Sequence, residues 1–343
     1  MSGAYVVLDM GGTTLRSALY DPESGMLSNA RREPTENFIK WPDLTLGQLQ
    51  EKVLEQLARC IAAQRACAPV AAACISFAGP VAQDGRVASA PTIWARAGAP
   101  LALGARLSAA LDMPVHVLND VTAAAWRYSE RVDEPFCLIT VSSGTGNKVY
   151  YGGQTLVNRD GFGGEIGHLR VDFALDAPMC DCGERGHLGA LASGRGTLEV
   201  ARRFARADPD AFSASLLARL CGGGDNAADA ITTYHLVDAA KAGDAFAAGC
   251  VRHGIGFMAR TIATIYAAIG VRRYLFMGGF ALALGELYRQ WVAAELRSIG
   301  MFGVAPEAIV DLLEMTEEDD DHGLVGAGCY LHHTLTQQKK ETT

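Results

Sequence analysis

Three glycine-containing turns, each directly after an apolar segment, are candidates for holding phosphate groups. They are Gly11, Gly12, Thr13 and Thr14, which follow Asp9 at the end of the first apolar segment; Gly144, Thr145 and Gly146; and Gly278 and Gly279. Glycine leaves backbone N–H groups open to an anion, although a plain hairpin turn also uses glycine. Because ligands of α/β sheets bind outside the carboxyl ends of strands, three such turns predict a nucleotide site. Neither the lysine pattern of a P-loop nor a complete GxGxxG is present, which disfavours P-loop enzymes and dinucleotide dehydrogenases.

A carboxylate that could act as a general base stands at another predicted strand end. Asn119 and Asp120 follow the apolar segment 115–118 and precede the helix-forming segment 121–125. A carboxylate at the start of this helix could accept the proton of an attacking hydroxyl. It could equally cap the helix, which contributes about 1 kcal/mol to stability. Both roles remain open on these residues alone.

Two cysteines and two histidines have the spacing of a metal site. Cys180 and Cys182 are separated by one residue, and His168 and His187 flank them. Two thiolates and two imidazoles can supply a tetrahedral zinc site. With all four ligands from the protein such a zinc is structural, since a catalytic zinc keeps one position open for water. The alternative is a polar loop in which these residues meet by coincidence.

Composition restricts the class of protein. With 343 residues, of which 49% are hydrophobic, the chain can form two modest domains around one cleft. A net charge of -8 argues against a nucleic-acid partner, because phosphates require a basic face. We find neither a leader peptide nor about twenty consecutive apolar residues, so we expect no membrane partner and a cytoplasmic location. Nine dispersed cysteines indicate reduced thiols, mostly in the cores, plus one local metal site.

Strand and helix patterns alternate along the chain and predict an α/β fold. We expect a hairpin at 5–20, a helix through 46–61, a strand at 70–77, a helix near 100–111, strands at 115–118 and within 136–157, helices through 194–269, a strand at 273–277 and a final helix from about 323. The predicted domains are a small N-terminal α/β lobe at 1–118, joined by a C-terminal helix at about 320–337, and a large α/β lobe at 119–318 with a metal segment at about 165–190. The acidic run 317–321 is expected to be a solvated loop rather than a metal site.

Five segments in order resemble the ROK family of sugar kinases, repressors and open reading frames, from Asp9 to about Gly328. They are DMGGTTLR, LNDVTAAA, SSGTGN, GGEIGH and CDCGERGHLGALASG. The resemblance implies the two-lobed fold of actin-like ATPases and sugar kinases, which is ribonuclease H-like. It also implies ATP-dependent phosphorylation of a hydroxyl, primary by expectation, on a hexose or a hexose-like compound.

The same resemblance implies a role for each matching residue. Asp120 would be the base; Asn119, Asp120, Glu165 and His168 would bind the sugar; Asp9 would help to organise Mg²⁺; Gly11, Gly12, Thr13, Thr14, Gly144, Thr145, Gly146, Gly278 and Gly279 would line the ATP phosphates and nucleotide; and His168, Cys180, Cys182 and His187 would bind structural Zn²⁺. His168 would serve sugar and metal together through its two ring nitrogens. Because dimers are common in the family, we also expect a homodimer.

Three departures from the family pattern bear on the acceptor. His187 stands where a third cysteine is usual, Gly189 where a sugar-binding Glu is usual, and Thr92-Ile93 where members often read Asn-Leu. These departures predict that the part of the site that binds the acceptor is altered and that the part that binds the phosphates is not. A C7 cyclitol or an aminosugar of the kanosamine type is therefore an alternative to glucose. The non-enzyme alternative is a sugar-sensing regulator, which would carry an N-terminal DNA-binding domain; because the phosphate motif begins at Asp9, we expect an enzyme.

Overall fold

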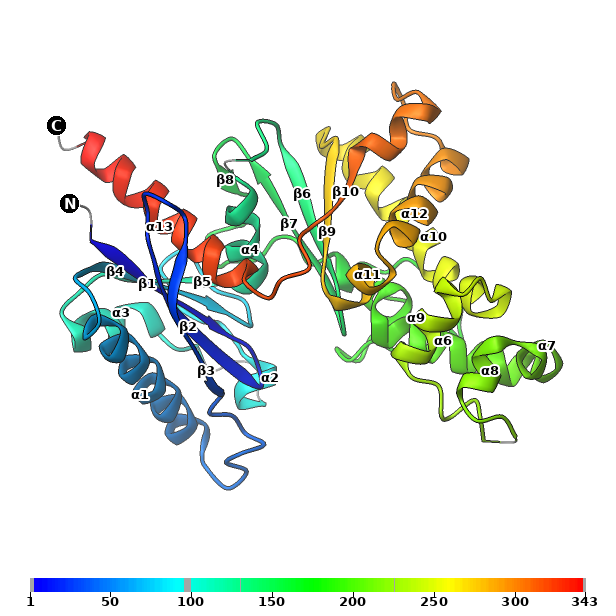
Figure 1. The fold of residues 1–343 in the computed structure, drawn as a ribbon, viewed down its shortest axis with the longest axis horizontal. Helices are drawn as coiled ribbons and strands as arrows, with labels where there is room; N and C mark the ends of the chain where they lie inside the picture. Colours follow the sequence, from blue (N-terminus) through cyan, green and yellow to red (C-terminus); the bar gives the residue numbers. More distant parts are fainter. Residues whose placement is uncertain (1–2, 96–99, 130, 225, 342–343) are drawn as a thin grey trace. The chain divides into compact units, whose positions relative to one another are not determined.

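The computed structural model describes residues 3–95, 100–129, 131–224 and 226–341, which form two compact units (Figure 1). Unit 1 contains the described residues of Met1–Asp133, Tyr150–Gly163 and Asp319–Thr343, and unit 2 contains those of Glu134–Val149 and Gly164–Glu318. The strands among these residues build two five-stranded sheets. This arrangement confirms the predicted α/β class.

The first sheet has the strand order β3-β2-β1-β4-β5. Its strands are β1 Ala4–Met10, β2 Thr14–Tyr20, β3 Leu27–Pro34, β4 Val70–Phe77 and β5 Val115–Asn119. β1 and β2 form the predicted antiparallel hairpin, whereas β1, β4 and β5 run parallel. Met10, Phe77 and Asn119 are in register across the three parallel strands. The carboxyl ends of these strands therefore lie at one edge of the sheet.

Helices cover both faces of this sheet. They are α1 Leu46–Arg65, α2 Pro91–Trp94, α3 Leu103–Leu111, α4 Asp120–Tyr128 and α13 His322–Glu341. Val6 and Leu8 of β1 belong to the core that includes α1 and α3, whereas Tyr5 and Val7 pack with α13. Because side chains alternate along a strand, Asp9 lies on the α13 face.

Local sequence explains the first helix. Thr45 caps α1 in a capping box with Gln48, whose side chain accepts from the Thr45 backbone N–H. Leu49, Val53 and Leu57 recur every fourth residue and are buried. The predicted helix is thereby confirmed. The helix predicted from Pro100 begins instead at Leu103, because Leu101 pairs with Val87 in a β-bridge.

The final helix returns to the first sheet, as predicted. α13, red in Figure 1, packs against β1, β4 and α4. Gly326 makes this possible, since a Cβ there would lie 1.7 Å from the Ala123 carbonyl oxygen. Helix α4 belongs to unit 1 because it packs on α13. The predicted lobe boundary, after residue 118, had assigned this helix to the large lobe.

The second sheet has the order β10-β9-β6-β7-β8. Its strands are β6 Phe136–Val141, β7 Thr145–Tyr151, β8 Gln154–Thr155, β9 Arg273–Met277 and β10 Leu313–Met315. The helices between these strands are α5 Gly189–Ala192, α6 Gly194–Ala207, α7 Pro209–Ala214, α8 Leu216–Leu220, α9 Thr233–Lys241, α10 Ala245–Ile269, α11 Gly279–Leu284 and α12 Glu286–Ile299. Short 3₁₀ turns span Ile166–His168 and Pro306–Leu312. The described residues of the stretch 194–269, which was predicted to be helical, form five helices.

Two further expectations concern exposure. The segment 317–321 is an exposed loop, as predicted, although each of its three aspartates also has an arginine partner. Asp319, Asp320 and Asp321 pair with Arg127, Arg32 and Arg16, respectively. Among the residues described, no helix combines the length and apolar character needed to cross a bilayer.

Candidate functional site

The first glycine turn is fixed by donors from the segment after β3. Thr35 donates its backbone N–H to the Thr13 carbonyl at 3.0 Å and its hydroxyl to the Gly11 carbonyl at 2.8 Å. The Asn37 amide donates to the Gly12 carbonyl at 2.7 Å. Each of these three carbonyls therefore has a protein partner. The turn is held rigidly before any ligand binds.

Gly12 is needed because helix α2 approaches it closely. A Cβ at position 12 would lie 2.8 Å from the Thr92 Cβ. Thr92 is one of the three departures from the family pattern. The structure places Thr92 against the first glycine turn, and its predicted effect on the substrate side stays a prediction.

Asp9, at the end of β1, is held by two side chains. Arg16 contacts Asp9 Oδ2 at 2.5 Å, and the Ser76 hydroxyl donates to Oδ1 at 2.6 Å. Asp9 and Arg16 have side chains that are 19% and 17% exposed. Both carboxylate oxygens are thus oriented, yet the group remains accessible.

Asn119, rather than Asp120, supplies the side chain that caps helix α4. Its Oδ1 accepts from the N–H groups of Val121 and Thr122. The Asn119 amide donates to Asp120 Oδ1 at 2.7 Å and to the Gly79 carbonyl at 3.0 Å. The capping role that the sequence left open for Asp120 therefore belongs to its neighbour, although Asp120 Oδ1 also accepts from Val121 N–H. Asp120 is partly buried at the first position of the helix.

Sheet register brings these groups of unit 1 together at one edge. Asp9 pairs with Ser76 across β1 and β4, and Phe77 pairs with Asn119 across β4 and β5. Asp120 follows immediately. The predicted phosphate turn and the predicted base are therefore carried by the same row of strand ends, as the position of ligands in α/β sheets requires.

The turns of unit 2 lie at the corresponding edge of the second sheet. Thr140 and Met277 are in register at the ends of the parallel strands β6 and β9. Gly278 has a φ of +94°, and a Cβ there would lie 2.7 Å from the Val141 carbonyl oxygen. Only glycine suits both the backbone conformation and the close approach. The second and third glycine turns are consequently neighbours.

A pocket of about 570 Å³ opens beside these two turns. It is lined by Ser142, Ser143, Gly194, Arg195, Leu198, Thr233, Tyr234, Val237, Asp238, Lys241, Gly279, Phe280 and Ala283. Its apolar walls with a few polar groups have the character of a small-molecule site. Residues from α9, such as Tyr234, were not predicted, because nothing in their local sequence separates them from an ordinary amphipathic helix.

A stack of glycines joins the second turn to the metal segment. A Cβ at Gly167 would lie 2.1 Å from the Thr145 carbonyl oxygen, and one at Gly189 would lie 3.1 Å from the Gly167 carbonyl oxygen. A Cβ at Gly196 would lie 2.6 Å from the Gly189 carbonyl oxygen. Backbones therefore touch from the phosphate turn to the start of α6. Gly189 is the first residue of helix α5.

The four predicted metal ligands converge. The ligand atoms of His168, Cys180, Cys182 and His187 all lie within 4.8 Å of one another. Cys180 Sγ is 3.7 Å from His168 Nδ1, and Cys182 Sγ is 3.3 Å from His187 Nδ1. Zn–S and Zn–N bonds in a tetrahedron place sulfur and nitrogen about 3.6 Å apart. The donor set and its spacing therefore fit a zinc ion.

Glu165 has a partner that the sequence did not reveal. Lys148 of β7 is buried, with its side chain 3% exposed, and its Nζ lies 3.7 Å from Glu165 Oε1. The Asn147 backbone N–H donates to the Gly164 carbonyl at 3.0 Å, which places the Glu165 segment against β7. The only local signal for Lys148 is its position in strand β7 directly before the apolar residues Val149 and Tyr150.

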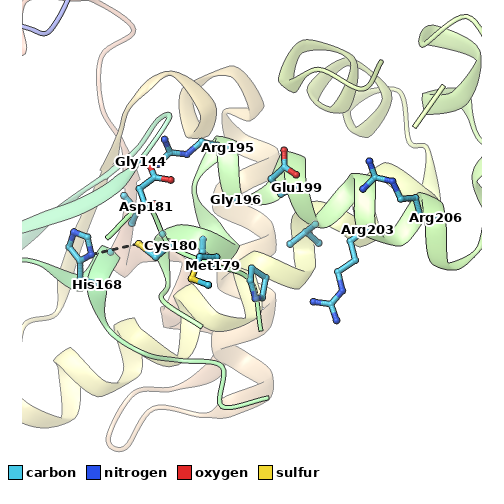
Figure 2. A pocket seen from close by; sticks show the side chains of 16 residues that line it. Gly144, His168, Met179, Cys180, Asp181, Arg195, Gly196, Glu199, Arg203 and Arg206 are labelled. Atoms are coloured by element: carbon cyan, nitrogen blue, oxygen red, sulfur yellow. Dashed lines mark hydrogen bonds and ion pairs between the residues drawn. The ribbon is translucent and has the colours of Figure 1, made fainter. Parts of the chain in front are cut away.

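A second pocket of about 700 Å³ lies between the metal segment and α6 (Figure 2). Its lining includes Gly144, Thr145, His168, Gly189, Arg203 and Arg206. Figure 2 shows His168 and Cys180 far from Arg206 along this pocket. No side chain projects from position 189 into this space.

The predicted residues thus separate into two groups, one in each unit. Asp9, Gly11, Gly12, Thr13, Thr14, Asn119 and Asp120 lie in unit 1; Gly144, Thr145, Gly146, Glu165, His168, Cys180, Cys182, His187, Gly278 and Gly279 lie in unit 2. Within each unit the residues occupy one sheet edge or the loops beside it.

Two curated relatives have related activities in their names. The chain is 46% identical over 326 residues to a C(7)-cyclitol 7-kinase of Streptomyces hygroscopicus subsp. limoneus, a match covering 94% of this chain and 92% of that protein. It is 34% identical over 221 residues to a 2-epi-5-epi-valiolone 7-kinase of an Actinoplanes strain, covering 61% and 60%. The predicted class, a sugar or cyclitol kinase, agrees with both names.

Solved structures and a family model give the same assignment. A ROK hexokinase from Thermus thermophilus superimposes with a TM-score of 0.71 at 25% identity, covering 96% of this chain and 99% of that one. A ROK glucokinase from Streptomyces griseus, in complex with glucose and AMPPNP, gives 0.71 at 24% identity, with 95% and 98% covered, and shows the fold alone. These likenesses confirm the predicted sugar-kinase fold. A model described as ROK family matches residues 5–334, and the chain therefore belongs to the ROK family.

Proposed function

We propose that this chain is an ATP-dependent kinase of a C7 cyclitol and that it phosphorylates the primary hydroxyl on carbon 7. The observation that carries the proposal is the 46% identity, over 94% of the chain, to a protein named C(7)-cyclitol 7-kinase. The sequence alone left hexoses, aminosugars and cyclitols as alternatives. The relatives favour the cyclitol, whose carbon 7 stands outside a six-membered ring as carbon 6 does in a hexose.

Asp120 is assigned as the base for the attacking hydroxyl. Asn119 caps the helix, so the Asp120 carboxylate is not required for capping, and the bond from the Asn119 amide fixes its orientation. A base must lie within hydrogen-bond reach of the proton that it removes. We therefore place the acceptor hydroxyl against Asp120, which orients it and takes its proton as the phosphoryl group is transferred.

Asp9 is assigned to the Mg²⁺ that accompanies ATP. Its oxygens are held by Arg16 and Ser76, and a carboxylate offers about four acceptor positions, so places remain for water around a metal ion. Bound Mg²⁺ would neutralise phosphate charge during transfer. Asp9 would hold that hydrated ion in place, because its own orientation is fixed before the ligand arrives.

The three glycine turns are assigned to the phosphates, and the 570 Å³ pocket to the nucleoside of ATP. Gly279 lines this pocket and follows Gly278, so the pocket begins where the third turn ends. Asp238 and Lys241 supply polar groups for the ribose or the base, and Phe280 supplies apolar surface. Backbone N–H groups in such turns stabilise phosphoryl charge without reorganisation.

His168, Cys180, Cys182 and His187 are assigned to a structural zinc. His168 Nδ1 faces Cys180, so Nε2 is left for the acceptor, and binding to the metal would fix this tautomer. Zinc would supply four bonds that hold the loop. His168 and Glu165 would then present their polar atoms to the ring hydroxyls of the acceptor.

Gly189 is assigned to acceptor selection. The residue lies against Gly167, next to His168, and lines the 700 Å³ pocket without a side chain. A carboxylate that grips a hydroxyl contributes about ten- to hundredfold in affinity. Its absence reduces the preference for a hexose and leaves space for a ring with different substituents.

The test is an acceptor panel with purified protein, ATP and Mg²⁺. Glucose, N-acetylmannosamine, kanosamine and 2-epi-5-epi-valiolone are compared by kcat/KM. The highest value is expected for the C7 cyclitol. A higher value for glucose would contradict the choice of acceptor, and absence of ATP-dependent turnover with every compound would favour a sensor.

Homodimer formation and a cytoplasmic location remain predictions, and sedimentation of the purified protein tests the first.

A further inference from the structure

The start of helix α13 is preceded by three aspartates with three different arginine partners. Asp319 pairs with Arg127 of α4, Asp320 with Arg32 of β3, and Asp321 with Arg16 of β2. Arg16 and Arg32 are direct cross-strand neighbours, so their like charges lie close together. The aspartates offset this repulsion. Two of the three pairs also reach elements that carry the candidate site.

Arg16 is shared between two carboxylates. Its Nη2 lies 2.5 Å from Asp9 Oδ2, while its Nη1 lies 3.6 Å from Asp321 Oδ1. The Arg16 side chain is 17% exposed and that of Asp321 is 49% exposed. Asp321 therefore reduces the positive charge that Arg16 presents to Asp9.

The backbone of Asp321 is held by two hydrogen bonds. Its backbone N–H donates to Asp319 Oδ1 at 2.9 Å, and its carbonyl accepts from the Val325 N–H at 2.8 Å. Asp319 in turn contacts Arg127 through both oxygens, at 2.5 and 2.7 Å. A bidentate pair of this kind fixes orientation as well as distance.

Packing at the start of α13 further fixes the distance to Asp9. A Cβ at Gly323 would lie 2.4 Å from Asp9 Oδ1 and 2.7 Å from the Ser76 hydroxyl oxygen. The backbone two residues after Asp321 thus touches the carboxylate that Arg16 binds. Asp321 and Asp9 are both ion-paired with Arg16. A change of charge at Asp321 therefore changes the electrostatic potential at Asp9.

We propose that Asp321 is a positioning residue of the kinase reaction, which acts through Arg16 on Asp9 and sets the affinity of the site for the divalent cation. The proposal rests on the function proposed above for Asp9. With Asp321 charged, Arg16 orients Asp9 but repels a cation less strongly. Without that charge, Arg16 would orient Asp9 equally well and would oppose the cation more strongly.

The experiment measures cation binding and turnover in the full chain. Binding of Mn²⁺ in the presence of ADP is followed by electron paramagnetic resonance, and the Mg²⁺ concentration for half-maximal rate is measured separately. Asp321→Asn is compared with Asp320→Asn, a matched control in the same run whose partner Arg32 is 63% exposed. Arg16→Gln is the third variant.

Asp321→Asn is expected to weaken Mn²⁺ binding by about two- to fivefold, the range for a partly exposed ion pair. It should raise the half-saturating Mg²⁺ concentration by the same factor, with kcat at saturating Mg²⁺ within twofold of wild type. Arg16→Gln should bind Mn²⁺ more tightly yet lose kcat, because Asp9 is no longer oriented. Asp320→Asn should match wild type.

Equal Mn²⁺ affinity in Asp321→Asn and Asp320→Asn would overturn the proposal, as would a wild type that binds no Mn²⁺ with ADP. If Arg16→Gln does not fold, the Asp321 and Asp320 variants alone decide. The proposed acceptor can fail separately, since Mn²⁺ binding with ADP needs no acceptor.

Discussion

Asp9 of β1 and Arg16 of β2 are direct cross-strand partners, and their side chains form an ion pair of 2.5 Å. The hairpin register alone places them together, because residues opposite each other in an antiparallel pair lie on the same face. The carboxylate at the phosphate turn is therefore oriented by its own hairpin. The proposed Mg²⁺ and nucleotide would therefore meet a carboxylate whose orientation is already fixed.

Asp120→Asn should fold normally and lose at least about 100-fold in kcat, because the amide cannot take the hydroxyl proton. Asn119 provides the cap, so helix α4 should keep its stability. Circular dichroism and kinase rates measure the two effects. Asp133→Asn, on an exposed position, is the control and should behave as wild type. A folded Asp120→Asn enzyme that keeps most of its turnover would exclude Asp120 as the base.

Cys180→Ser combined with Cys182→Ser should remove about one zinc per chain and lower the thermal stability, since metal binding contributes folding free energy. Because Gly167 touches both Thr145 and Gly189, loss of metal should also weaken ATP binding. Elemental analysis and calorimetric titration with ATP provide the data. Cys67→Ser, an exposed thiol outside the cluster, is the control. Folded wild type that contains no zinc after careful purification argues against the site.

Gly189→Glu should improve glucose use relative to the cyclitol by up to about two orders of magnitude, through restored charged hydrogen bonds. The Cβ would lie 3.1 Å from the Gly167 carbonyl oxygen, so a small shift is needed. Gly189→Ala introduces the same crowding without the carboxylate and separates the two effects. An equal change in acceptor preference for both variants would show that crowding, not charge, is responsible.

Asp319→Asn should destabilise the fold at neutral pH by about 1–3 kcal/mol, because buried Arg127 loses its charged partner. The Arg127 hydrogen bonds lower the pKa of Asp319 from 3.8 to about 2. A carboxyl group whose pKa is lower in the folded than in the unfolded state stabilises the fold at pH values above its unfolded-state pKa. This stabilisation is lost as the pH falls through the folded-state pKa. The difference in melting temperature between wild type and Asp319→Asn should therefore be full above about pH 4 and shrink toward pH 2.

Asp320→Asn serves as the control for this comparison, since its partner Arg32 is largely exposed. It should change the melting temperature little at any pH. A difference between wild type and Asp319→Asn that stays constant down to pH 2 would contradict the assigned pKa.

The fold was predictable where local sequence carries the signal. Strand β4 is found at the predicted residues because an apolar run ends at Gly79-Pro80, and α1 follows from apolar residues at every fourth position. The clustering of Cys180, Cys182 and His187 was predictable because these residues lie within eight residues of one another.

Contacts between distant segments were not predictable in the same way. Arg127 and Asp319 are 192 residues apart, and no local pattern distinguishes their pair from solvated charges. Thr92 could not be placed against Gly12 for the same reason. Lys148 reads as a strand residue with an exposed tip, whereas tertiary packing buries it beside Glu165.

The position of phosphorylation tests the central claim most directly. Wild-type protein is incubated with ATP, Mg²⁺ and 2-epi-5-epi-valiolone, and the product is examined by phosphorus–proton correlation NMR. We expect a single monoester whose phosphorus couples to the two protons on carbon 7, with one ADP formed per product molecule. A phosphate on a ring carbon, or ADP formation without a phosphorylated cyclitol, would contradict the proposed function.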